Sequence, residues 1–309
     1  MTGMFGEIVV GWSGSGLSSR AAEWAARHAA RSGRTLVLLR AVDNNDDGVV
    51  PPEEFDACCE LTEEEAARLA RVEPNLRVRA IVERGSLEVA LRHFSLRADL
   101  VVLGRRAHPE RGFHTVVGTL ATRSACPVVA VPFATDAAPR GIVVGIDGTQ
   151  ASVLAAMVAA QEATAIGEPL TIAHSWLEPS AWQTAFPLGD EMIASIEDVH
   201  RRTLHAIVTE VQAAFPELTV TPKLLRGSAQ SVLVHADDHP ELIVVGSRAR
   251  SVAAEVLLGS VAYEAALHAD HPVMIVREDG IGPVGRRALE AARHSAAPHS
   301  IPSEHVPLA

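Results

Sequence analysis

An aspartate at the end of an apolar run is the first residue of this chain with clear chemical potential. Asp147 follows Ile142–Ile146 at the point where a long alanine-rich stretch begins. A carboxylate there either caps the following helix or accepts hydrogen bonds from the polar groups of a nucleoside. Both interpretations place it at the carboxyl end of a strand, where open α/β sheets bind their ligands.

A second segment, from Gly246 to Ser260, has the residue types of an anion site. Gly246 and Ser247 end another apolar run, and Gly259 and Ser260 precede a helix-like stretch. Glycine lets backbone amides approach an anion closely, and the free N–H groups of a helix N-terminus attract phosphate. Two glycines alone are equally well explained as turn residues.

The elements that position these residues follow from the apolar pattern. Short valine-, isoleucine- and leucine-rich runs alternate with longer alanine-rich segments, which is typical of buried parallel strands joined by crossover helices. We therefore predict two tandem Rossmann-like α/β domains, each a five-stranded parallel sheet with helices on both faces. In the second half, strands are expected near residues 141–147, 169–175, 218–225, 241–246 and 272–276.

The chain repeats itself once. EIVVGWSGS, which starts at Glu7, corresponds to GIVVGIDGT from Gly141, and RADLVVLGRRA from Arg97 corresponds to HPELIVVGSRA from His239. The matched segments keep their order, so one domain has been duplicated. We predict domains at 1–133 and 141–277, a linker at 134–140 and a mostly disordered, flexible tail at 278–309 with one possible short helix near 286–293.

The composition excludes several classes of protein. The chain has 309 residues, is 48% hydrophobic and carries a formal net charge of -11, so it can bury a core but repels nucleic-acid phosphates. Its one lysine, Lys223, follows Pro222 rather than a glycine, which excludes a Walker A loop. Three cysteines without CxxC spacing favour a reducing compartment and argue against structural zinc, and no apolar run reaches the ~20 residues of a membrane span. We expect a cytoplasmic protein that binds neither nucleic acid nor membrane.

The order, duplication and spacing of these segments together resemble the universal stress protein family. Gly246, Ala249, Gly259 and Ser260 follow the family's G-x2-G-x9-G-[ST] signature, with Ala249 in place of the middle glycine. The resemblance covers about residues 5–132 and 141–277. It implies the adenine nucleotide alpha hydrolase-like form of the Rossmann-like fold, with the two halves packed as a pseudo-dimer through their last strands.

The resemblance also implies a function, the binding of ATP, with or without Mg2+, by a stress or growth regulator that is not an enzyme. Asp147 would bind the adenosine and Ser175 or its neighbours the adenine. The phosphates would lie on the glycine segment and its first-half counterpart, which comprise Gly246, Ser247, Gly259, Ser260, Val261 and Gly104. The regulated protein partner is unidentified, and a homodimer of the whole chain is left open.

The first half departs from this pattern. Ser13 stands where the second half has Asp147, and Ala107 occupies the middle glycine position after Gly104. The closing pair of the signature is either Gly118 and Thr119, with one residue too many, or His114 and Thr115 after a three-residue deletion. The second reading keeps the last helix and strand in register. We expect the second half to bind nucleotide better.

Two alternatives to nucleotide-dependent regulation remain. One is an ATPase or nucleotidyltransferase on the same site, against which stand the absent lysine motif and the absence of a general base near Asp147. The other is an interaction module without nucleotide, favoured by Ser13, Ala107 and Ala249. Trp176 and Trp182 could pack over a nucleotide, lie in the core or face a partner.

Overall fold

The computed structural model describes most of both repeats and a segment beyond them. The described residues are 6–43, 50–105, 116–133, 139–178, 189–229, 233, 239–247, 250–252, 255–257, 262, 265–266 and 269–295.

The first half alternates strands and helices as the apolar pattern predicts. Its strands are β1 (Glu7–Gly11), β2 (Thr35–Val42), β3 (Arg77–Arg84), β4 (Leu100–Arg105) and β5 (Val128–Pro132). Its helices are α1 (Gly16–Ser32), α2 (Pro52–Val72), α3 (Leu87–Phe94) and α4 (Val116–Arg123). Helix α1 starts at the N-cap Ser15 and ends at Gly33, whose φ of 68° is the left-handed conformation that favours glycine.

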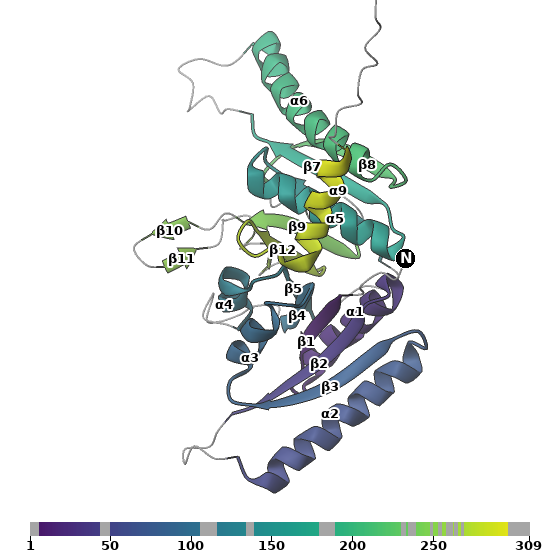
Figure 1. Ribbon diagram of the computed structural model, residues 1–309. Helices are drawn as coiled ribbons and strands as arrows, with labels where there is room; N and C mark the ends of the chain where they lie inside the picture. The colour runs from purple at the N-terminus through teal and green to yellow at the C-terminus, as the bar shows by residue number, and fades with distance from the viewer. Residues whose placement is uncertain are drawn as a thin grey trace, which may run out of the picture.

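The second half repeats the same order. Its strands are β6 (Ile142–Ile146), β7 (Leu170–Trp176), β8 (Val220–Arg226), β9 (Leu242–Ser247) and β12 (Val273–Arg277), close to the predicted ranges. Helices α5 (Gln150–Ile166) and α6 (Asp190–Ala214) follow β6 and β7. The residues of the two later predicted helices are mostly outside the described part. A short hairpin, β10 (Arg250–Val252) and β11 (Glu255–Leu257), follows β9 and projects from the body of the molecule (Figure 1).

The two predicted five-stranded sheets are joined into one sheet of ten strands, in the order β3-β2-β1-β4-β5-β12-β9-β6-β7-β8. All neighbours are parallel except β5 and β12, which pair antiparallel at the centre. The halves therefore meet through their last strands, as the resemblance implied.

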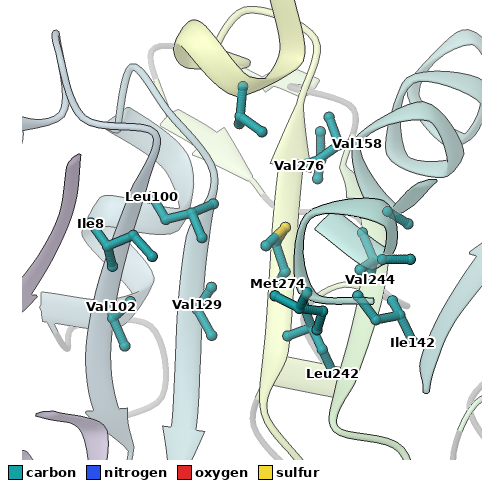
Figure 2. Close-up of a cluster of buried hydrophobic side chains, with 14 of the residues drawn as sticks. Ile8, Leu100, Val102, Val129, Ile142, Val158, Leu242, Val244, Met274 and Val276 are labelled. Carbon is teal, nitrogen blue, oxygen red and sulfur yellow. The ribbon is translucent and has the colours of Figure 1, made fainter. Parts of the chain in front are cut away.

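Alternate residues of the strands face opposite layers of helices, so both faces of the sheet are buried. One face forms a single apolar cluster that runs through both halves and includes Ile8, Val102, Ile142 and Met274 (Figure 2). Helices α1, α2, α5 and α6 cover this face, and α9 (Gly282–Ser295) packs on α5 and α6. The other face carries a separate apolar cluster in each half. The cluster of the first half includes Val101, and that of the second half includes Val245.

The halves are also joined by charged residues from α1, α5 and α9 and from the segments that precede β2 and β4. Glu162 of α5 has no exposed surface and accepts hydrogen bonds from both terminal nitrogens of Arg34, at 2.7 and 2.8 Å. The ring of His28 lies 2.8 Å from the same carboxylate. Arg34 also contacts Asp99 at 3.2 Å, and Arg287 reaches Asp99 from α9 at 2.7 Å. The buried carboxylates of Glu162 and Asp99 are thus each paired with an arginine, because an unpaired buried charge would be strongly destabilising.

Helix α9 corrects the prediction of a flexible tail at 278–309. Residues 282–295 form a helix that packs on α5 and α6, with no exposed surface on Val284 or Ala288. The possible short helix near 286–293 is confirmed and is longer than expected. The disorder predicted around it was inferred from the prolines of this segment. Pro283, however, lies in the first turn of α9, where its absent N–H is not needed. Residues 296–309 and most of the predicted linker are outside the described residues. No helix in the described ranges is long and apolar enough to cross a membrane.

Candidate nucleotide site

A cleft lies at the carboxyl ends of the second-half strands. Strand β6 has β7 on one side and β9 on the other, so the strand order reverses beside it, which is where such sheets bind ligands. The cleft holds about 570 Å³ of empty space, which includes open solvent at its mouth. Its lining comprises Gly145, Ile146, Asp147, Thr149, Ala151, Ser152, Ala173, Ser175, Ala229, Leu233, Val245 and Gly246. The structure thus brings three sequence-predicted residues, Asp147, Ser175 and Gly246, into one cleft.

Asp147 lies in the turn that links β6 to α5. Gly148 has a φ of 80°, so the chain turns through a conformation that glycine adopts without strain. The Asp147 carboxylate accepts hydrogen bonds from the backbone N–H of Thr149 at 3.0 Å and from its hydroxyl at 2.5 Å. Thr149, in turn, is the N-cap and accepts from the N–H of Ser152 at 3.4 Å. Asp147 is therefore not the cap itself; it orients the capping residue and lies exposed at the mouth of the cleft.

Gly246 brings the end of β9 close to the first turn of α5. A Cβ atom at this position would lie 2.6 Å from the carbonyl oxygen of Ala151 and 3.0 Å from the nitrogen of Ser152. The first half repeats this contact, since a Cβ on Gly104 would lie 2.6 Å from the carbonyl oxygen of Leu17. From the sequence, Gly246 was expected to let a phosphate approach the backbone closely. The atoms that occupy its missing side chain belong instead to the helix backbone, and the glycine sets the helix N-terminus beside the cleft.

The remaining predicted residues are not placed at the cleft. Ser247 ends β9, is almost fully buried and is absent from the cleft lining. Gly259, Ser260 and Val261 are outside the described residues. The hairpin β10–β11 lies in the chain between Gly246 and Gly259. It was not predicted from the sequence, because its residues were interpreted as one loop of the signature.

Two histidines behind the cleft were missed by sequence reasoning. His174 of β7 is buried, and its Nδ1 lies 2.7 Å from the carbonyl oxygen of Ile146, while its Nε2 lies 2.9 Å from Nδ1 of His200 on α6. Burial, and then the neighbouring His174, lower the pKa of His200. Trp176 is buried and stacks on His200 with ring centroids 5.9 Å apart, so of its three interpretations the structure supports packing in the interior.

The corresponding turn of the first half has another chemistry. Gly14 has a φ of 79° and matches Gly148, but the hydroxyls of Ser13, Ser15 and Ser18 hydrogen-bond one another where the second half has its carboxylate. Gly11 pairs with Leu39 as Gly145 pairs with Ala173. Counting on from these pairs, Arg40 stands in place of His174 and Ala41 in place of Ser175.

Arg40 lies over the ring of Trp12, 5.4 Å from its centroid. The first half therefore lacks the carboxylate, the serine and the histidine pair of the second. In its phosphate segment, Ala107, His114 and Thr115 are outside the described residues. Gly118 and Thr119, the other candidate pair, lie within helix α4 rather than at its start.

Comparison with known proteins identifies the family. The sequence profile of the Universal stress protein family matches residues 4–132 and 139–277. A universal stress protein of Mycobacterium tuberculosis is 28% identical over 291 residues, which cover 88% of this chain and 97% of that protein. Another from the same organism is 30% identical over 182 residues, 57% of this chain and 59% of the relative.

The fold agrees with this assignment. The crystal structure of a universal stress protein from Archaeoglobus fulgidus matches with a TM-score of 0.61 over 88% of this chain and 98% of that chain, at 17% identity. The chain belongs to the universal stress protein family and carries two copies of its domain in tandem.

Proposed function

We propose that the chain binds ATP in the cleft of its second half and that occupancy of this cleft regulates a protein partner. The observation that carries the proposal is the convergence of Asp147, Ser175 and the N-terminus of α5 on one cleft at the reversal of strand order. These are a carboxylate, a hydroxyl and a set of helix N–H groups, the groups that a ribose, a base and a phosphate require.

The cleft has an apolar wall at one part and polar or charged groups at another, which suits a nucleotide. Val245, Leu233 and Ala173 give it an apolar wall against which a flat base can pack. Ser175 adds a hydroxyl at the end of β7, and Asp147 offers charged acceptors to ribose hydroxyls. The first turn of α5 supplies a favourable dipole for the phosphates. Among the described residues that line the cleft, Asp147 is the one carboxylate, so Mg2+ bound with ATP would be held chiefly by the phosphates and water.

The first half is proposed to bind nucleotide more weakly. Replacement of a carboxylate by the hydroxyl of Ser13 removes a charge-assisted hydrogen bond of ~1.5–3 kcal/mol, which is about ten- to a hundredfold in affinity. Ala41 removes a second polar contact at the position of Ser175. This half would then serve mainly as a packing partner through β5.

A regulatory readout would come from the segment after Gly246. The hairpin β10–β11 projects from the sheet between the two parts of the family signature (Figure 1). Phosphates bound at the first turn of α5, beside the end of β9 from which the hairpin continues, would change the surface that the hairpin presents to a partner.

Nucleotide that co-purifies with the protein provides the test. Freshly purified protein is denatured and analysed by mass spectrometry, and ATP is added to a second sample in a thermal-shift assay. We expect ATP, ADP or AMP in the first measurement and a rise in melting temperature in the second. The absence of both signals would favour the interaction module without nucleotide. Steady turnover of labelled ATP that is lost in Asp147→Ala would instead favour an enzyme.

A further inference from the structure

The histidine pair behind the cleft is surrounded by residues that line it. His174 lies between Ala173 and Ser175 in β7, and its ring bonds to the carbonyl oxygen of Ile146 in β6; all three of these neighbours line the cleft. Since successive side chains of a strand point to opposite faces, the ring itself faces α6 rather than the cleft. His174 therefore touches the site only through the backbone of its neighbours.

The carbonyl fixes the direction of the hydrogen bonds. A carbonyl oxygen only accepts, so Nδ1 of His174 carries a proton and donates to Ile146. In a neutral ring Nε2 is then an acceptor, and Nδ1 of His200 has to donate to it. The result is a directed chain from His200 through His174 to the backbone that immediately precedes Asp147.

Helix α6 contacts the same turn at a second point. A Cβ on Gly148 would lie 3.0 Å from a methyl carbon of Thr203, so the side chain of Thr203 packs directly against the turn. Thr203 and His200 are three residues apart and lie on one face of the helix. The C-terminal half of α6 is anchored to the sheet by buried side chains, which include Leu204 and Val211. Figure 1 shows the other end of the helix extending beyond the sheet.

We propose that His174 and His200 are positioning residues that couple the nucleotide cleft to helix α6, a role that rests on the proposed binding of ATP. They hold the turn from Ile146 to Thr149 in the geometry that presents Asp147 to the ribose. Because the chain of hydrogen bonds also fixes α6, a ligand that orders this turn reduces the motion of α6 as well. Helix α6 carries the exposed side chains of Met192 and Val199, so occupancy would reach a surface that a partner can contact.

The first half provides an internal comparison. Arg40 stands at the position of His174 and lies over Trp12 instead of bonding a histidine of the following helix. The coupling therefore belongs to the second half, where the carboxylate is also found.

Three variants and two measurements test the proposal. His200→Leu removes the donor and leaves the acceptor nitrogen of His174 without its partner. His200→Asn keeps an N–H near the position of Nδ1 without the ring. The control, His205→Leu, changes an exposed histidine of the same helix. We measure ATP affinity by calorimetric titration and backbone hydrogen exchange in α6 with and without ATP. Thermal unfolding shows that each variant is folded.

We expect His200→Leu to weaken ATP binding about tenfold, His200→Asn to restore it to within about threefold of the wild type, and His205→Leu to have no effect. ATP should slow exchange around residues 199–204 of the wild type and of His200→Asn, but not of His200→Leu. Equal affinities and equal exchange in all variants would overturn the coupling while leaving ATP binding intact. A wild type that binds no ATP would overturn both proposals.

Discussion

Replacement of Glu162 by a neutral side chain should break the network of buried charges that joins the two halves. Its carboxylate is fully buried and bonded to Arg34 and His28. Burial alone would raise the pKa of Glu162, but the Arg34 guanidinium and the His28 ring outweigh that effect and lower it to about 2. The reciprocal effect is seen on Arg34, whose pKa is raised by Glu162 in spite of burial.

The size and sign of the effect follow from this pKa. A decrease from 4.5 to about 2 corresponds to about 3 kcal/mol of stability, at about 1.4 kcal/mol per pKa unit. Because the pKa is lower in the folded state, this stability is fully present above pH 4.5 and is lost as the pH falls towards 2. Glu162→Gln keeps the size of the side chain but leaves the Arg34 charge without its main partner, so we expect a loss of about 3–5 kcal/mol at pH 7.

Urea denaturation at pH 7 and near pH 3 measures both quantities. The free energy of unfolding of the wild type should decrease between pH 7 and pH 3. The decrease for Glu162→Gln should be smaller than that of the wild type by at least about 1 kcal/mol. Glu197→Gln is the matched control, because Glu197 forms an exposed pair with Arg201 and should cost less than about 0.5 kcal/mol. A loss below about 1 kcal/mol for Glu162→Gln, or parallel pH dependence in the two proteins, would refute the reasoning.

Three further changes test other parts of the structure. Gly246→Ala would place a methyl 2.6 Å from the Ala151 carbonyl, so we expect about 1–3 kcal/mol lower stability in thermal unfolding and weaker ATP binding; an unchanged protein would contradict the close contact. Arg287→Met removes one partner of the buried Asp99 carboxylate and should cost about 1–3 kcal/mol in urea, whereas a neutral result would mean that α9 does not stabilise the junction. Ser13→Asp should add a second, weaker ATP in calorimetric titration, and unaltered stoichiometry would show that the missing carboxylate is not what separates the halves.

The sequence predicts those features that depend on local pattern. Apolar runs such as Leu242–Ser247 gave the strands, because parallel strands are covered on both faces and read as continuous hydrophobic segments. Because β6, β7 and β9 are parallel, their carboxyl ends lie at one edge of the sheet. The convergence of Asp147, Ser175 and Gly246 in the cleft follows from this topology, whereas their role as nucleotide ligands stays a prediction.

The features that sequence reasoning missed depend on contacts between distant segments. The pairing of His174 with His200 joins a strand to a later helix, and Glu162 meets Arg34 across 128 residues of chain; no spacing in the sequence marks either contact. A short helix near 286–293 could be expected from the sequence, but its packing on α5 and α6, which buries Val284, could not. The pairing of β5 with β12, which joins the two sheets into one, was implied by the family resemblance, but no local pattern in the sequence marks it.

Calorimetric titration of ATP into the wild type, Asp147→Ala, Asp147→Asn and Ser13→Ala tests the central claim most directly. Asn keeps an acceptor for the N–H of Thr149, so this variant separates loss of the charge from collapse of the turn. We predict one dominant site in the wild type, a loss of about ten- to a hundredfold in both Asp147 variants, and no change in Ser13→Ala. Equal affinity in the wild type and the Asp147 variants, or a loss confined to Ser13→Ala, would contradict the account.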